Sequence, residues 1–200
     1  MITIEDIQKY ELYLRYLNKK LGEFFEEQAP YIFCKEGCSH CCEKGEYPMS
    51  EIEFAYLNLG SRTLPFETFV QIDKNVEKIK AERLQYSGKE KFMHECPFLI
   101  NKKCALYNFR AIICRSHGLA FFSKDGKIMV PDCVHRGLNY STVYDEKTNT
   151  ITTENFKKTQ NTQEPLAHNV RLGFLTSNSL TEELELNFGE IKPLIDWLTQ

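Results

Sequence analysis

The chain has 200 residues, of which 42% are hydrophobic and 12% aromatic, so it can form a core and is not a disordered polypeptide. Its net charge is only −3 and it carries no concentrated basic stripe, which argues against nucleic acid as a partner. Its apolar runs are too short to cross a bilayer and its first residues lack a secretory signal, so we expect a cytoplasmic protein without membrane contact.

The N-terminal segment predicts one long helix over residues 4–28. Apolar residues recur there at alternating spacings of three and four, which places them on one helical face: Ile7, Tyr10, Leu14, Leu17, Leu21 and Phe24. Thr3 and Asp6 resemble a capping box at its start, and Pro30 ends it. We expect this face to pack on the helix's own domain rather than to form a dimer seam.

Two further helices are predicted before residue 91. Ser50 and Glu53 form a second capping-box pattern, for a helix that ends near Gly60. Pro65 suits a first helical position, and a helical period continues from there to about Tyr86. Residues 61–91 therefore read as a helical insert between two groups of cysteines.

From residue 96 onward the pattern changes to short β-hairpins. One hairpin is expected around the polar residues 101–103, a second around Asp125-Gly126, and a third over 142–153. Residues 108–118 fit a short helix with Asn108 as its cap, and the last residues predict a helix that docks Trp197. The expected fold class is α+β, with the long N-terminal helix and the insert packed with hairpins around a cysteine-rich metal centre.

Eight cysteines dominate the chemistry of the sequence. Because structural disulfides are rare in the cytosol, we interpret the cysteines as metal ligands. They fall into one tight group and one dispersed group, and all eight are candidate ligands: Cys34, Cys38, Cys41 and Cys42, then Cys96, Cys104, Cys114 and Cys133. Eight thiolates suffice for two four-ligand sites, or for one Fe–S cluster and one zinc ion.

The adjacent pair Cys41-Cys42 bears on the kind of metal. Neighbouring side chains on a helix or strand point in different directions, so we expect these two not to share a mononuclear ion. Either they reach different metals, or they serve a polynuclear cluster, or one of them is not a ligand. Their adjacency suggests more than one metal atom, which modestly favours a polynuclear iron cluster over zinc.

Histidine and arginine accompany the cysteines. His40, His94, His117 and His135 each lie within three residues of a cysteine, and we interpret them mainly as donors to the ligands, with His117 the best candidate for a direct ligand. Arg110 and Arg115 flank Cys114, where they would offset thiolate charge or hold an anionic substrate.

Three known cysteine motifs do not fit this sequence. The spacing of Cys34, Cys38 and Cys41 is that of radical SAM enzymes, but the series of βα units which that fold needs does not follow. A haem c site fails because Cys42 stands where its histidine belongs. A thioredoxin-like dithiol at Cys38 and Cys41 lacks the surrounding βαβ pattern.

Four elements in order resemble the YkgJ-type CxxCxxCC cysteine-cluster family, which is described as a zinc- or iron-chelating domain. They are "CKEGCSHCC", "CPFL", "CALYNFRAIICR" and "PDC", and they cover residues 31–140. The chain departs from the family in having Ala111 where proline is usual, and three residues rather than two between the first two cysteines. Some relatives are flagellin lysine N-methylases with an Fe–S cluster.

The resemblance implies metal binding without assigning catalytic residues here. We expect a single domain over 1–200, with a metal-binding core at 31–140 and a C-terminal extension at 141–200. One interpretation is an Fe–S-dependent enzyme, such as a protein-modifying lysine N-methylase, that carries out a redox or methyl-transfer reaction on an unidentified protein or small molecule. The other is a structural or interaction domain stapled by zinc. The sequence predicts neither the substrate nor the oligomeric state.

Overall fold

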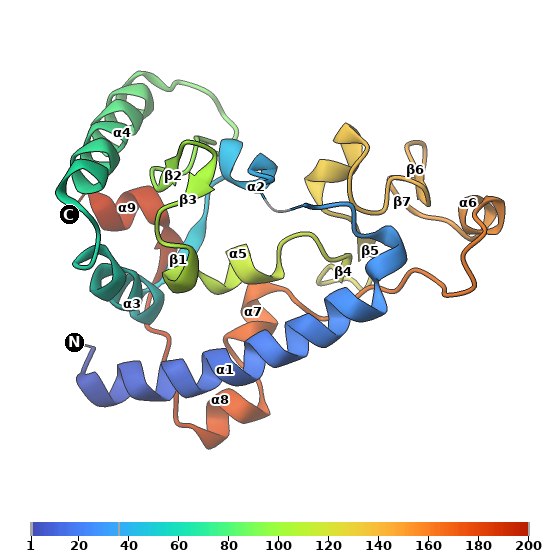
Figure 1. Ribbon diagram of the computed structural model, residues 1–200, viewed down its shortest axis with the longest axis horizontal. Coiled ribbons are helices and arrows are strands. Elements are labelled where there is room, and N and C mark those ends of the chain that lie inside the picture. The colour runs from blue at the N-terminus through green and yellow to red at the C-terminus, as the bar shows by residue number, and fades with distance from the viewer. Residues whose placement is uncertain (1, 36, 200) are drawn as a thin grey trace. The chain divides into compact units, whose positions relative to one another are not determined.

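The computed structural model describes residues 2–35 and 37–199 and confirms the α+β class (Figure 1). Its α-helices are α1 Ile4–Glu27, α2 His40–Glu43, α3 Glu51–Ser61, α4 Phe66–Gln85, α5 Ile112–Ser116, α6 Thr153–Lys158, α7 Leu172–Leu175, α8 Ser179–Glu183 and α9 Leu194–Leu198. Its strands are β1 Pro48–Ser50, β2 Leu99–Ile100, β3 Lys103–Cys104, β4 Phe121–Phe122, β5 Ile128–Met129, β6 Tyr144–Asp145, β7 Thr150–Ile151 and β8 Ile191–Pro193. The described strands pair two by two, all antiparallel.

The chain divides into two compact units. The first unit comprises residues 1–11, 37–114 and 185–200, and the second comprises residues 12–36 and 115–184. The expected single domain over 1–200 and its 31–140 core stay predictions. The expected C-terminal extension is shared between the units, because its last residues belong to the first.

Helix α1 confirms the predicted long helix and its start. The Asp6 carboxylate accepts hydrogen bonds from the backbone N–H and the hydroxyl of Thr3, as a capping interaction requires. Leu14, Leu17 and Leu21 of the predicted apolar face are buried within this chain. The face therefore packs on its own chain, as expected.

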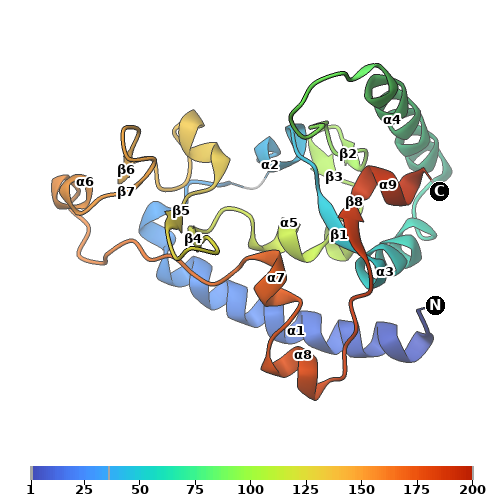
Figure 2. The same cartoon turned by 180° about the vertical axis from the view of Figure 1, so that it is seen from behind.

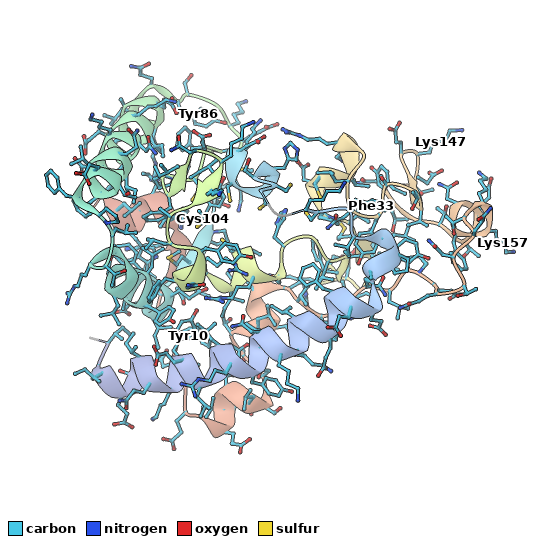
Figure 3. All side chains as sticks on the ribbon, viewed as in Figure 1. Tyr10, Phe33, Tyr86, Cys104, Lys147 and Lys157 are labelled. Atoms are coloured by element: carbon cyan, nitrogen blue, oxygen red, sulfur yellow. The ribbon has the colours of Figure 1, made fainter. Side chains whose placement is uncertain are left out.

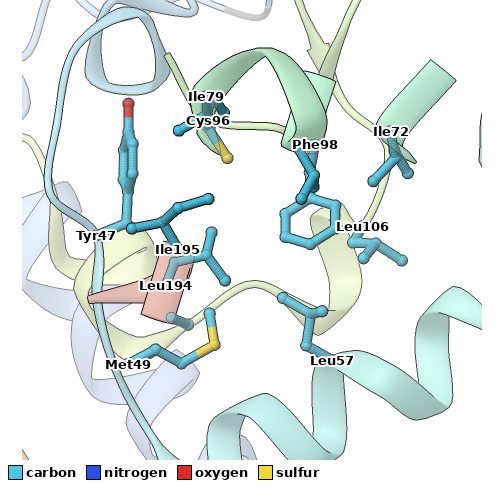
Figure 4. Packing of buried hydrophobic residues seen from close by; sticks show 12 residues of the cluster. Tyr47, Met49, Leu57, Ile72, Ile79, Cys96, Phe98, Leu106, Leu194 and Ile195 are labelled. Carbon is cyan, nitrogen blue, oxygen red and sulfur yellow. The ribbon is translucent and has the colours of Figure 1, made fainter. Parts of the chain in front are cut away.

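The core of the first unit brings distant segments of sequence together. Strand β1 pairs with β8, so that Ser50 lies opposite Ile191 (Figure 2). Next to β8, Leu194 and Ile195 are buried in one cluster with Cys96 (Figure 4). The Trp197 ring stacks on Phe54, which confirms the docking predicted for the last helix. Sequence reasoning missed the β1–β8 pair.

The second unit is built mainly from the C-terminal part of α1, two hairpins and short helices. Its core cluster contains Tyr31, Ala120, Tyr140 and Val143, all essentially unexposed. The β4–β5 hairpin turns at Asp125-Gly126 as predicted, with Gly126 at a φ of 78°. Strands β6 and β7 confirm the third predicted hairpin.

The expected cap of the helix after residue 107 is wrong. Asn108 lies inside a 3-10 turn, Tyr107–Phe109, and α5 begins only at Ile112. Pro65 precedes α4 as its N-cap instead of being its first residue. The capping box of Ser50 and Glu53 at α3 is present as predicted. Among the described residues, no helix has the length and apolarity needed to cross a membrane.

Candidate metal centre

Six of the eight cysteines lie in the first unit, and five of these six, all but Cys38, come together from four separate segments. Cys41 and Cys42 lie in α2, Cys96 precedes β2, Cys104 ends β3 and Cys114 lies in the middle of α5. Four of these five cysteines, all but Cys41, belong to or pack against the hydrophobic cluster of this unit. Figure 3 shows Cys104 beside the β2–β3 hairpin. None of the five thiols forms a disulfide.

Backbone hydrogen bonds join the two groups of cysteines. The Cys96 N–H donates to the Cys42 carbonyl at 2.8 Å, and Gly45 and His94 exchange two further bonds beside them. The Tyr47 hydroxyl donates to the same Cys42 carbonyl at 2.8 Å. Residues 42–47 are thereby fixed against residues 94–96, and β2–β3 then places Cys104 opposite Leu99.

The adjacent cysteines do not diverge as expected. The Cys41 and Cys42 Sγ atoms lie 3.8 Å apart. An ion bound tetrahedrally at about 2.3 Å from each sulfur separates two ligand sulfurs by about 3.8 Å. The helix has only four residues, and its end at Lys44 is extended, so the two side chains can turn toward each other. The pair is therefore compatible with one shared ion.

Mutual influence on pKa shows that the five thiols are electrostatic neighbours. Burial raises the pKa of Cys114 to about 12, and the nearby Cys104 and Cys41 add to the shift. Burial and then Cys114 raise the pKa of Cys96, and burial also raises that of Cys104. The hydrogen bond between the Cys41 and Cys42 thiols lowers the pKa of Cys41 and raises that of Cys42.

Arg110 is a cation close to these thiols. Its guanidinium lies 3.7 Å from the centre of the Tyr107 ring and donates to the Tyr107 carbonyl, which fixes its position. From there it lowers the pKa of Cys41 and opposes the upward shifts at Cys104 and Cys114. The expected offset of thiolate charge by Arg110 is thus compatible with the structure. Arg115 lies in the second unit, where its Nη1 donates to Asn18.

The other three predicted ligands are placed differently. Cys38 belongs to the first unit and is exposed, whereas Cys34 and Cys133 belong to the second. The buried Asn139 accepts hydrogen bonds from the backbone N–H groups of Phe33 and Cys34, and donates to the Gly118 carbonyl. The proposal that Cys34, Cys38 and Cys133 bind metal stays a prediction.

Among the histidines, His94 has the geometry closest to that of a ligand. Its Nδ1–H donates to the Glu95 carbonyl at 2.7 Å, while its buried Nε2 has no hydrogen-bond partner. Burial lowers its pKa, so the ring is held neutral. His40 contacts Glu43, His135 packs edge-on against Tyr144, and His117 is exposed.

The five thiols lie near one another, but their sulfur atoms are not positioned to bind one metal ion together. Among residues 2–35 and 37–199, no three or more His, Cys, Asp or Glu side chains are close enough together to hold a metal ion in this conformation. Binding by three or more of these thiols therefore requires their side chains to move closer together. The flexible χ1 angles of cysteine in short elements such as α2 and β3 allow such movements.

The role of Tyr47 in this region was not identified from the sequence, and only part of the role of Glu53 was identified. Tyr47 has no recognisable pattern around it, because its role comes from contact with Cys42. Glu53 was identified only as a capping residue of α3, yet its carboxylate also accepts a hydrogen bond from the Ile112 N–H, 59 residues later.

No match to this chain was found among protein-family models, curated proteins or solved structures.

Proposed function

We propose that the first unit binds a metal through thiolates drawn from Cys41, Cys42, Cys96, Cys104 and Cys114, in the reducing environment of the cytoplasm. The single observation that carries the proposal is the convergence of five reduced thiols from four segments on one region. Isolated buried cysteines are common as small hydrophobic residues, but five mutually interacting thiols in one cluster are not.

Zinc is the ion that this arrangement supports best. The Sγ separation of 3.8 Å between Cys41 and Cys42 matches one tetrahedral ion, whereas in an Fe–S cluster each thiolate binds its own iron atom. A zinc ion held here would join α2, β3 and α5, each too short to be stable alone. The ion would have a structural role, because it would hold these short elements together.

An Fe–S cluster is the second candidate. It is favoured by the number of thiols in one unit, which exceeds the four that zinc needs, and by the resemblance to the YkgJ-type family. It would support the reading of this chain as an Fe–S-dependent protein-modifying enzyme, with Arg110 beside the cluster.

The test is to purify the protein without oxygen and to count zinc, iron and acid-labile sulfide per chain. We expect about one zinc ion per chain, and loss of that ion in Cys42→Ser and Cys114→Ser. Cys34→Ser is the matched control, because Cys34 lies in the second unit, and it should keep the ion. Iron with equimolar sulfide would favour the second candidate. Wild-type protein that stays free of zinc and iron even after reconstitution would refute metal binding.

A further inference from the structure

The buried carboxylate of Glu53 contacts more than its capping role requires. Glu53 is 1% exposed, and a buried carboxylate is costly unless hydrogen bonds satisfy it. Its Oε2 accepts from the backbone N–H of Ser50 at 2.8 Å and from the Ser50 hydroxyl at 2.6 Å, which completes the capping box of α3. Its Oε1 is left for another element.

That second oxygen accepts from the backbone N–H of Ile112 at 2.7 Å. Ile112 is the first residue of α5 and is completely buried. The first N–H groups of a helix have no acceptor within it, so Glu53 supplies the acceptor that the sequence after Asn108 does not. Because a buried N–H without an acceptor is destabilising, this contact constrains where α5 begins.

Cys114 lies two residues after Ile112, in a helix of only five residues. Fixing the first residue of so short an element also fixes the backbone position from which the Cys114 side chain extends.

We propose that Glu53 is a positioning residue that orients the Cys114 thiol toward the other four cysteines. This role rests on the metal site proposed above. It assigns the two carboxylate oxygens to two tasks: Oε2 caps α3, and Oε1 sets the start of the helix that carries a ligand.

Cobalt binding to the full chain separates these tasks, because thiolate-to-cobalt charge-transfer absorbance reports how many thiolates bind each ion. In Glu53→Gln one oxygen becomes an amide donor, so Ile112 and Ser50 can no longer both be satisfied. We expect a 10- to 100-fold weaker affinity for cobalt, as for other residues that orient ligands. We also expect lower charge-transfer intensity per bound ion. Glu53→Asp is the second variant: it keeps the charge and the capping pattern, but is too short to reach both partners.

Ser50→Ala is the matched control, because it weakens the cap of α3 and leaves the Glu53–Ile112 contact in place. It should lower thermal stability while cobalt affinity and intensity per ion stay at wild-type values. The inference is overturned if both Glu53 variants keep wild-type intensity per ion, or if Ser50→Ala loses as much affinity as they do. Wild-type protein that binds no cobalt would instead refute the metal site itself, and this role with it.

Discussion

Zinc binding should be strongly coupled to pH, because most of the candidate ligands are protonated before the ion arrives. Four of the five thiols have a raised pKa, and that of Cys114 reaches about 12. Each thiol must lose its proton to become a ligand. An ion held by Cys41 and three of the others therefore displaces about three to four protons near neutral pH.

The magnitude follows from the number of protons. Each displaced proton changes the binding free energy by about 1.4 kcal/mol per pH unit, so three to four protons correspond to about 4–5 kcal/mol per unit. The affinity for zinc should rise with pH, because fewer protons then compete with the ion for the thiolates. A plot of log K for zinc against pH should have a slope of about 3–4 between about pH 6 and pH 8.

Competition with a chromophoric chelator at several pH values measures this slope. Calorimetry in two buffers of different ionisation enthalpy counts the protons independently. Cys34→Ser, which alters a cysteine of the second unit, should leave both numbers unchanged. A slope near one, or a single proton released per ion, would show that the buried thiols are not the ligands.

Three further predictions concern stability. Metal-free protein should lose stability as pH rises above about 8.5, because thiols of the unfolded chain ionise there while Cys114 in the folded chain stays protonated. With a pKa shift from 9.0 to about 12, this thiol accounts for a loss of about 1.4 kcal/mol at pH 10, which urea unfolding at pH 7 and pH 10 measures. Ile195→Ala should lower the stability of the first unit by about 2–5 kcal/mol, because the Ile195 side chain is only 2% exposed and its removal leaves a cavity. Faster hydrogen exchange at amides of that unit should detect this loss of stability. Asn139→Ala should lower the free energy of unfolding by about 2–4 kcal/mol, because it removes the hydrogen-bond partner of backbone groups of Phe33, Cys34 and Gly118. Hydrogen exchange at the Phe33 amide should become faster, and unchanged exchange there would contradict the role of Asn139.

Sequence reasoning succeeded where the determinants are local. The capping box of Ser50 and Glu53 identified the start of α3 from residues three apart. Asp125-Gly126 identified the β4–β5 turn, and the polar residues after Ile100 identified β2–β3, where Asn101 and Lys102 both take positive φ. In each case the signal lies within a few residues of the feature.

It failed where the partner is distant in sequence. The start of α5 was misplaced because its acceptor is Glu53 rather than Asn108. The β1–β8 pair was missed because three-residue strands carry little periodicity of their own. The proximity of the Cys41 and Cys42 sulfurs was missed for a different reason, since these residues are adjacent: it depends on side-chain rotamers in α2, which a general rule about alternating directions does not determine.

The β1–β8 pair has a consequence for synthesis on the ribosome. The nascent chain exposes the segments with Cys41, Cys42, Cys96, Cys104 and Cys114 well before β8 emerges, since Ile191 follows its partner Ser50 by 141 residues. Contacts so far apart in sequence form slowly. During that interval the thiols are open to oxidants and to competing metals. The arrival of β8 brings Leu194 and Ile195 into the cluster that contains Cys96, so burial of this cluster is completed only when the end of the chain has been made.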